Sequence, residues 1–361
     1  MSTSDDSPVL VTGASGFIAM HCILRLLEDG YRVRGTVRNA ERGKRVTEVL
    51  ARHADVSRFS LAFADLGSDA GWPQAVDGCA RILHVASPVP RTPPRTAEEV
   101  IGPARDGAIR VLSAAARAGV ERVVMTSSTS AVLYGHKRDG SKTYDESDWS
   151  ALTDEVSPYD RSKTIAERAA WDYVKALPEG QRLELVTINP GVVLGPVLCN
   201  EYSISGEVVR KLLARELPGV PDLGWALVDV RDVADVHAIA MTHPGAAGQR
   251  FIVALEHTPW LAIAEILARH FGPRGFKVPT RRVPGFVLKL VSLWDKTARL
   301  AVRELGKRQD VSSARARSVL GWKPRDLETM VVDMAESMIQ LGIVPLPRRA
   351  AAGQRAAKAA S

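Results

Sequence analysis

The fold class of this chain is decided by the segment VLVTGASGFIA, residues 9–19. A short apolar run leads into two glycines, and a helical pattern follows over 17–28, where apolar residues recur at every fourth position. Glycine permits a tight turn and a close approach of the backbone to a ligand, and the free N–H groups at a helix N-terminus attract anions. The spacing Gly-x-x-Gly-x-x-Ala therefore predicts a strand, turn and helix that bind the pyrophosphate of a dinucleotide. We expect contacts with the dinucleotide from Gly13, Ser15, Gly16, Phe17 and Ile18.

Short β-branched runs alternate with helical patterns as far as about residue 131, and this alternation is typical of βαβ units. We expect strands at 9–12, 32–37, 59–63, 81–85, 123–127 and 185–189, and helices at 17–28, 108–118 and 158–176. The pattern predicts an α/β fold with a doubly wound parallel (Rossmann) sheet. Proline and glycine become frequent after Pro190, which indicates a smaller, mixed C-terminal substrate lobe. The predicted domains are a cofactor domain at 8–190 and a lobe at 191–346, with about 225–245 returning to the first domain.

The composition excludes several other classes of protein. The chain has 361 residues, of which 45% are hydrophobic and 25% charged, as in ordinary soluble domains. Its three cysteines lie far apart and outside any Cys/His cluster, so we predict neither a disulfide framework nor a metal site. The sequence contains no uncharged apolar run of about 18 residues, and the first eight residues carry two aspartates in place of the basic residues of a secretion signal. We therefore expect a cytoplasmic protein without integral membrane association.

The net charge of +7 suggests a polyanionic partner at first. The last fifteen residues, 347–361, hold four basic residues and no acidic one, which leaves 44 basic against 41 acidic residues in the rest of the chain. More than half of the excess charge thus lies in a tail that we expect to be disordered and that lacks aromatic residues. We predict no nucleic-acid partner.

The end of the second predicted strand indicates which dinucleotide binds. An NAD site usually places Asp or Glu there to hold the ribose 2′-hydroxyl, whereas this chain has Arg38, followed by Lys44. A guanidinium binds a 2′-phosphate by charge-assisted hydrogen bonds, so we predict that NADP(H) is preferred over NAD(H). Asp65 and Leu66, which follow the third strand, are candidates for contact with the adenine.

Residues after the later strands are candidates for contact with the rest of the cofactor, because open α/β sheets bind ligands at the carboxyl ends of their strands. They are Val85, Ala86 and Ser87 after the fourth strand, Thr126 at the end of the fifth, and Pro190, Val192 and Val193 after the sixth. A cluster of hydroxyl residues, 127–130, also ends the fifth strand. Tyr159 and Lys163 then stand four residues apart on a predicted helix, where they share one face.

Taken in order, these motifs resemble those of the extended short-chain dehydrogenases/reductases. They are the segment 9–19, HVASP at 84–88, TSS at 126–128, Tyr159 with Lys163, NPG at 189–191 and DVRDVA at 229–234. The resemblance covers about residues 8–346 and is greatest to the dihydroflavonol reductases, cinnamoyl-CoA reductases and bacterial aldehyde reductases of the epimerase/dehydratase superfamily.

The resemblance implies that Ser128, Tyr159 and Lys163 are catalytic. In such enzymes the carbonyl carbon accepts hydride while the phenol of Tyr159 gives a proton to the developing alkoxide, and Ser128 orients the carbonyl oxygen. Lys163 would lower the pKa of the phenol, and both Tyr159 and Lys163 would contact the cofactor. A slip of one residue within 127–130 stays open for the serine.

We therefore expect an NADPH-dependent reductase that converts a small-molecule aldehyde or ketone to an alcohol, with a homodimer as the candidate assembly. Substrate contacts are predicted from Pro88, Val89, Tyr202, Ile204 and Trp225. Three alternatives stay open. Two are enzymes, a sugar-nucleotide epimerase and a 3β-hydroxysteroid dehydrogenase, and the third is a non-catalytic protein that senses NADP. The substrate itself does not follow from the scaffold, because one fold supports many activities.

Overall fold

The computed structural model describes residues 7–88, 96–202, 205–294 and 301–347. These residues contain a seven-stranded sheet in the order β3-β2-β1-β4-β5-β6-β9. Every neighbouring pair in it is parallel. Its strands are β1 (Val9–Val11), β2 (Val33–Val37), β3 (Phe59–Phe63), β4 (Arg81–His84), β5 (Arg122–Thr126), β6 (Glu184–Pro190) and β9 (Arg250–Val253). The doubly wound parallel sheet that the sequence predicts is thus confirmed.

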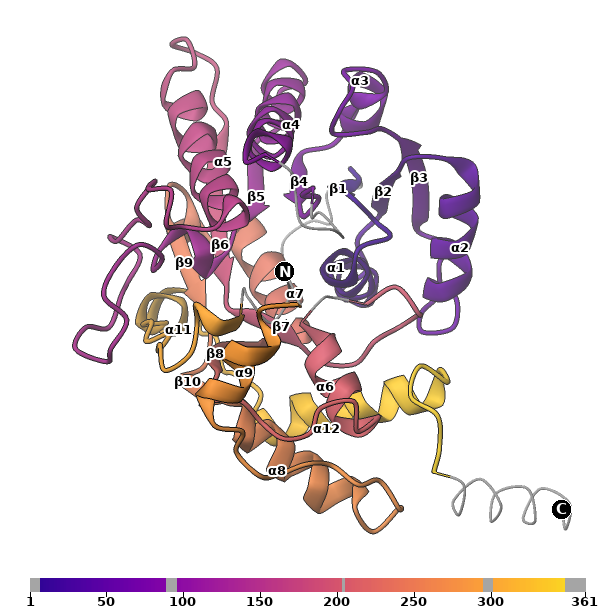
Figure 1. The fold of residues 1–361 in the computed structure, drawn as a ribbon. Helices are drawn as coiled ribbons and strands as arrows, with labels where there is room; N and C mark the ends of the chain where they lie inside the picture. The colour runs from indigo at the N-terminus through magenta and orange to yellow at the C-terminus, as the bar shows by residue number, and fades with distance from the viewer. Residues whose placement is uncertain (1–6, 89–95, 203–204, 295–300, 348–361) are drawn as a thin grey trace, which may run out of the picture.

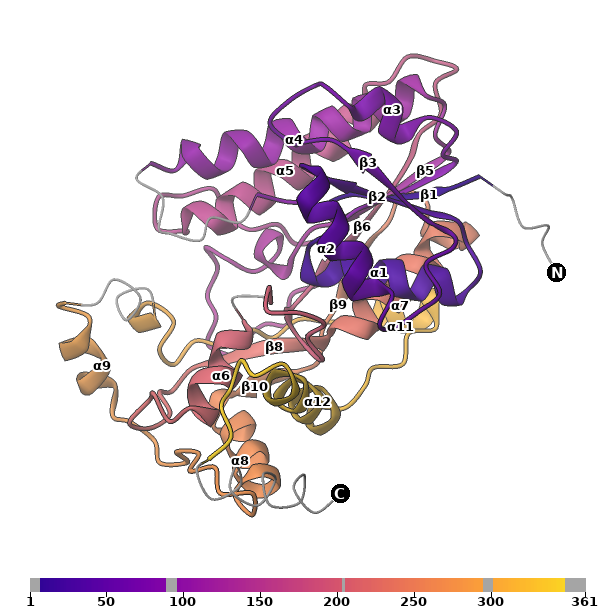
Figure 2. The same ribbon diagram turned by 90° about the vertical axis from the view of Figure 1, so that its right-hand side faces the viewer.

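Helices cover both faces of this sheet (Figures 1 and 2). One layer holds α1 (Phe17–Glu28), α2 (Ala40–Leu50) and α7 (Val230–Thr242), and the other holds α3 (Trp72–Val76), α4 (Glu98–Arg117) and α5 (Pro158–Lys175). Two layers of helices require strands that are apolar on both faces, and β1 and β5 are buried along their whole length. Because all seven strands are parallel, their carboxyl ends meet at one edge of the sheet.

A smaller lobe follows β6 and is built on a three-stranded sheet in the order β10-β8-β7. Its described elements are β7 (Val192–Leu194), α6 (Gly206–Leu213), β8 (Gly224–Asp229), β10 (His257–Pro259), α8 (Trp260–Phe271), α9 (Gly285–Val291) and α12 (Leu327–Gln340), whereas α11 (Ala314–Leu320) packs against α7 and β9 of the large sheet. The strand β8 pairs parallel with β7 and antiparallel with β10, so this sheet is mixed. Between β8 and β10 the chain returns to the large sheet as α7 and β9, which joins the two parts through a continuous core.

The helix expected at 108–118 begins ten residues earlier, at Glu98, and contains Pro103. Proline removes one backbone donor and favours a helix boundary before it, but burial of Val100 and Ile101 keeps the first turns helical. The basic tail at 348–361 lies outside the described residues. Across the ranges that the structure covers, no helix combines the length and the apolar character needed to span a bilayer.

Candidate active site

The glycine turn between β1 and α1 packs closely against the segment that follows β4. Gly13 has φ of 69°, its N–H donates to Thr36 Oγ1 at 2.9 Å, and a Cβ added there would stand 2.9 Å from the Cβ of Ala86. Gly16 begins α1 and donates to the carbonyl of Gly13 at 2.8 Å. No side chain caps α1, and its first turn holds no acidic residue. The free N–H groups at this end of the helix are therefore available to an anion.

Two buried side chains fix the segment that follows β4. The N–H of Ala86 donates to Thr12 Oγ1 at 3.0 Å, and the same hydroxyl is hydrogen-bonded to His84 Nδ1, 2.9 Å away. Burial, with a smaller contribution from the charge of Lys163, lowers the pKa of His84 to about 3. His84 is therefore neutral at physiological pH. Val85, Ala86 and Ser87 lie next to the glycine turn as a result.

Arg38 lies where β2 and β3 end. Its Nε stands 3.1 Å from Asp65 Oδ2, and its side chain is 65% exposed. The other oxygen of Asp65 accepts the N–H of Gly67 at 2.7 Å, which fixes the carboxylate. Lys44 is on the exposed side of α2, with its Nζ 4.0 Å from Glu48. The structure thus holds Arg38 at the sheet edge and gives Lys44 an acidic neighbour within its own helix.

Leu66 follows Asp65 in the chain and contacts α4. Its carbonyl accepts a hydrogen bond from Arg110, and its side chain covers Gly107, where an added Cβ would stand 3.1 Å from the Cβ of Leu66. The glycine allows the turn after β3 to approach the helix closely. Asp65 and Leu66 are therefore held beside the carboxyl end of the sheet.

Tyr159 and Lys163 project from the first turns of α5. Ser157 caps this helix by accepting the N–H of Asp160, and Pro158 occupies its first position. The Nζ of Lys163 donates to Ser87 Oγ at 3.0 Å and stands 5.9 Å from the centroid of the Tyr159 ring. The contact between Lys163 and Ser87 joins α5 to the segment after β4.

Burial shifts the pKa values of Tyr159 and Lys163 in opposite directions. Burial lowers the pKa of Lys163 to about 8, although the charge of Glu167 opposes the shift. Burial and the charge of Asp160 raise the pKa of the Tyr159 phenol. The phenol pKa is therefore raised in this structure because desolvation dominates, and a lowering effect of Lys163 on it stays a prediction.

Three consecutive hydroxyl residues end β5, and they differ in their surroundings. Thr126 is buried with its hydroxyl 2.7 Å from His237 Nε2, and Ser127 is buried and donates to Glu167 Oε2 at 2.5 Å. Ser128 begins a 3₁₀ turn, η1 (Thr129–Ala131), where its hydroxyl accepts the N–H of Ser130 at 3.1 Å. Ser128 is partly exposed, whereas its neighbours from 126 to 130 are buried. This difference favours Ser128 for contact with a ligand.

The path after β6 is fixed by a close approach of two backbones. A Cβ on Gly191 would stand 2.2 Å from the carbonyl oxygen of Ala226, and the N–H of Gly191 donates to Val253 at 3.1 Å. Pro190 ends β6, while Val192 and Val193 begin β7. The chain therefore passes from the large sheet to the small one directly beside the carboxyl end of β6.

The residues predicted to contact substrate have different outcomes. Pro88 follows Ser87 at the sheet edge, whereas Val89 and Ile204 lie outside the described residues. The hydroxyl of Tyr202 donates to Glu207, and the Trp225 ring packs edge-on against Trp260 with their centroids 4.7 Å apart. Tyr202 and Trp225 thus have contacts within the small lobe, and their role towards substrate stays a prediction.

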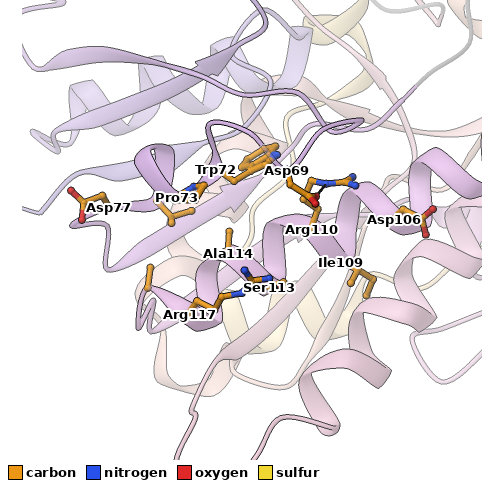
Figure 3. Close-up of a pocket in the computed structure, with 12 residues that line it drawn as sticks. Asp69, Trp72, Pro73, Asp77, Asp106, Ile109, Arg110, Ser113, Ala114 and Arg117 are labelled. Atoms are coloured by element: carbon orange, nitrogen blue, oxygen red, sulfur yellow. Dashed lines mark hydrogen bonds and ion pairs between the residues drawn. The ribbon is translucent and has the colours of Figure 1, made fainter.

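A surface hollow of about 570 Å³ lies between α3 and α4, on the layer that faces away from the small lobe (Figures 2 and 3). Trp72, Arg110 and Arg117 are among its lining residues, and the Arg110 guanidinium is paired with Asp69. Ser128, Tyr159 and Lys163 are not part of its lining. We therefore locate the candidate active site at the carboxyl edge of the sheet and not in this hollow.

Glu167 and Arg250 form a buried ion pair that the sequence pattern did not reveal. Arg250 Nε stands 2.7 Å from Glu167 Oε1, beneath the serines that follow β5. The sequence does contain one signal for Glu167, because this residue lies one turn after Lys163 on the same face of the helix. Nothing local indicates that Arg250, 83 positions later, is its partner.

The fold is of the Rossmann type, and the candidate dinucleotide site lies at the carboxyl edge of its sheet. The model of the NAD dependent epimerase/dehydratase family matches residues 9–254. The chain belongs to this family, and it is an oxidoreductase of the extended short-chain dehydrogenase/reductase group.

Individual relatives are reductases. Cinnamoyl-CoA reductase 1 of Arabidopsis thaliana is 38% identical over 276 residues, which cover 76% of this chain and 77% of that protein. The ketoreductase azaE of Aspergillus niger is 30% identical and covers 92% of this chain and 97% of its own length. Among solved structures, the yeast methylglyoxal/isovaleraldehyde reductase Gre2 complexed with NADPH superposes with a TM-score of 0.78 at 28% identity, covering 92% of this chain and 98% of that one.

Proposed function

We propose that this chain reduces an aldehyde or ketone to an alcohol with NADPH, using Ser128, Tyr159 and Lys163. The observation that carries the proposal is the hydrogen bond between Lys163 Nζ and Ser87 Oγ, 3.0 Å long. It brings the helix that holds Tyr159 to the carboxyl ends of β4 and β5, beside the glycine turn at Gly13, which packs against Ala86. Open sheets of this kind bind their ligands at that edge.

The residues present fit a dinucleotide. The uncapped N-terminus of α1 suits a pyrophosphate, and the missing side chain of Gly13 keeps the turn close to Ala86. The residues that would hold the cofactor are Gly13, Ser15, Gly16, Phe17, Ile18, Arg38, Lys44, Asp65, Leu66, Val85, Ala86, Ser87, Thr126, Tyr159, Lys163, Pro190, Val192 and Val193. When bound, the nicotinamide supplies the hydride that reaches the carbonyl carbon.

Tyr159 supplies the proton in this proposal. Its raised pKa keeps the phenol protonated at neutral pH, which suits an acid that acts during reduction. Ser128 donates a hydrogen bond to the carbonyl oxygen and orients it towards Tyr159. Lys163 is largely an ammonium ion at pH 7, since its pKa is about 8, and its charge stabilises the phenolate that remains after proton transfer.

The preference for NADPH rests on Arg38. Its guanidinium is exposed at the ends of β2 and β3 and is held there by Asp65. Arginine binds phosphate through two parallel N–H groups, so Arg38 is placed to recognise a 2′-phosphate. The yeast reductase that superposes on this chain was solved with NADPH, which supports the same choice.

The test is NADPH oxidation by purified protein with a panel of aromatic and aliphatic aldehydes and ketones, including cinnamoyl thioesters. Tyr159→Phe removes one oxygen and is expected to lower kcat by about 100- to 10,000-fold, the usual contribution of a positioned acid. Its NADPH affinity, measured by the fluorescence of the bound nicotinamide, should change little. Wild-type turnover by Tyr159→Phe would exclude the proposed proton donor, and inactivity of the wild type on the whole panel would exclude the proposed substrate class.

A further inference from the structure

Glu167 is a fully buried carboxylate in α5. Its Oε2 accepts from Ser127 Oγ at 2.5 Å and from Asn189 Nδ2 at 2.7 Å. Its Oε1 accepts from Arg250 Nε at 2.7 Å and from Thr187 Oγ1 at 2.9 Å. Trp171 Nε1 of the same helix also donates to Oε1, at 3.4 Å. Five donors thus converge on one carboxylate, three on Oε1 and two on Oε2.

Four of these donors come from three adjacent strands of the large sheet, and Trp171 lies on α5 itself. Ser127 follows β5, Thr187 and Asn189 lie on β6, and Arg250 begins β9. The same amide nitrogen of Asn189 also stands 3.1 Å from the carbonyl oxygen of Ser128. Glu167 therefore connects α5 to the backbone that carries the candidate catalytic serine.

The cation of this pair is itself fixed. The Arg250 guanidinium lies 3.7 Å from the centroid of the Trp149 ring and donates to the carbonyls of Glu146 at 2.7 Å and Asp148 at 2.9 Å. Arg250 is thus clamped between the loop before α5 and the carboxylate of Glu167. The position of the carboxylate follows from the sheet and from that loop together.

Burying a carboxylate and a guanidinium costs free energy, and a neutral pair of similar shape is often as stable or more stable. Stability alone is therefore a weak reason for Glu167. A glutamine would fill the same volume, but its NH₂ group would face either Asn189 Nδ2 or Arg250 Nε, and neither of these N–H donors can accept a hydrogen bond from it. The arrangement specifically requires an acceptor with two equivalent oxygens.

We propose that Glu167 is a positioning residue for the reduction. It fixes Ser128, through Ser127 and Asn189, relative to Tyr159 and Lys163, which lie two turns and one turn away on its own helix. It also supplies the negative charge that faces the Lys163 ammonium inside the protein. This inference rests on the proposed function, and it adds to the site a residue that does not itself touch substrate or cofactor.

The charge has a predictable direction of effect. The ionisable groups around this cluster are Lys163 and Tyr159 on α5, the neutral His84 on β4, Arg250 on β9 and Glu146 in the loop before α5. The charge of Glu167 raises the pKa of Lys163 against the effect of burial. Removing it leaves Arg250 without its anion, so Lys163 loses its proton at a lower pH.

The experiment compares Glu167→Gln with Glu184→Gln as a matched control. Glu184 lies at the opposite end of β6 and pairs with the buried Arg122 of β5 at 2.6 Å, so the control makes the same chemical change in another Glu–Arg pair of the same sheet. For Glu167→Gln we expect kcat to fall by about 10- to 100-fold, the range for a misplacement of reacting groups by up to about 1 Å. The KM for NADPH should stay within about twofold, and the loss of kcat at alkaline pH should begin at lower pH. Glu184→Gln should keep the wild-type kcat and pH profile.

A double-mutant cycle tests whether Glu167 acts through the serine. If it does, Glu167→Gln should lower kcat much less in a Ser128→Ala background than in the wild type, because the two residues act as a unit. Fully additive losses and an unshifted pH profile would overturn the inference. Equal kcat for Glu167→Gln and Glu184→Gln, with both proteins folded and binding NADPH, would overturn it as well.

Thermal denaturation and NADPH fluorescence separate folding from catalysis. If Glu167→Gln does not fold, the test uses Asn189→Ala, which removes the link between Glu167 and the Ser128 carbonyl. A lowered kcat of Asn189→Ala with unchanged NADPH binding supports the inference, and an unchanged kcat overturns it. Tyr159→Phe keeps the two proposals apart. Its activity tests the proposed proton donor, whereas the difference between the two glutamate variants tests only the positioning role.

Discussion

Replacing Arg38 by alanine tests the proposed preference for NADPH, and the variant should distinguish NADPH from NADH poorly. The Arg38 side chain is 65% exposed and its Nε lies 3.1 Å from Asp65, so it is held at the sheet edge but stays accessible to a ligand. A hydrogen bond to a charged group contributes about 1.5–3 kcal/mol, and solvent screening of an exposed guanidinium favours the lower part of that range. The expected loss in kcat/KM for NADPH is therefore about 10- to 30-fold, since about 1.4 kcal/mol corresponds to a factor of ten. The value for NADH should change by less than about twofold, because a 2′-hydroxyl carries no charge.

Arg45→Ala is the matched control for this variant. Arg45 lies on α2, its side chain is 66% exposed, and it pairs with Glu41, so its removal changes the net charge equally at the same exposure. The assay is steady-state reduction of one aldehyde with each cofactor at several salt concentrations. Equal losses for NADPH and NADH, or equal losses for Arg38→Ala and Arg45→Ala, would refute the assignment of Arg38 to the 2′-phosphate.

Three further outcomes follow from the geometry and the titrating groups. The kcat/KM for reduction should fall as pH rises through about 8, because the ammonium form of Lys163 is present below its pKa and is lost above it; a flat profile from pH 7 to 9.5 would contradict this. Gly13→Ala should lower the free energy of unfolding by about 1–2 kcal/mol and weaken NADPH binding in fluorescence titrations, since φ of 69° is strained for alanine, whereas Gly30→Ala, at φ of 84° with open space around it, should affect folding but not NADPH binding. The melting temperature should fall between pH 7 and pH 5, because histidines that are buried and neutral take up protons only on unfolding, and an unchanged melting temperature would speak against this. The pKa is lowered to about 4 for His21, to about 3 for His84 and to about 4 for His237, below the usual value of 6.5.

The local pattern of the sequence was enough for the parallel sheet and its glycine turn. Strands that are buried on both faces read as continuous apolar runs, and the turn needs a residue that tolerates positive φ, so both leave a signature within a few positions. The helix with Tyr159 and Lys163 was predicted for the same reason, because a spacing of four residues fixes a shared helix face. Helix boundaries were less determined: the apolar pattern indicated a helix only over 108–118, whereas α4 begins at Glu98 and its first turns are buried by tertiary contacts.

The sequence by itself thus determined the fold class, the turn at Gly13 and the order of the candidate catalytic residues, since each depends on interactions between close neighbours in the chain. Only the tertiary structure decided the surroundings of those residues. It raised the pKa of Tyr159 by burial, joined Lys163 to Ser87, and brought Arg250 to Glu167 across 83 positions. Desolvation and long-range ion pairs depend on which segments contact each other in the folded chain, and a local sequence pattern does not show which segments those are.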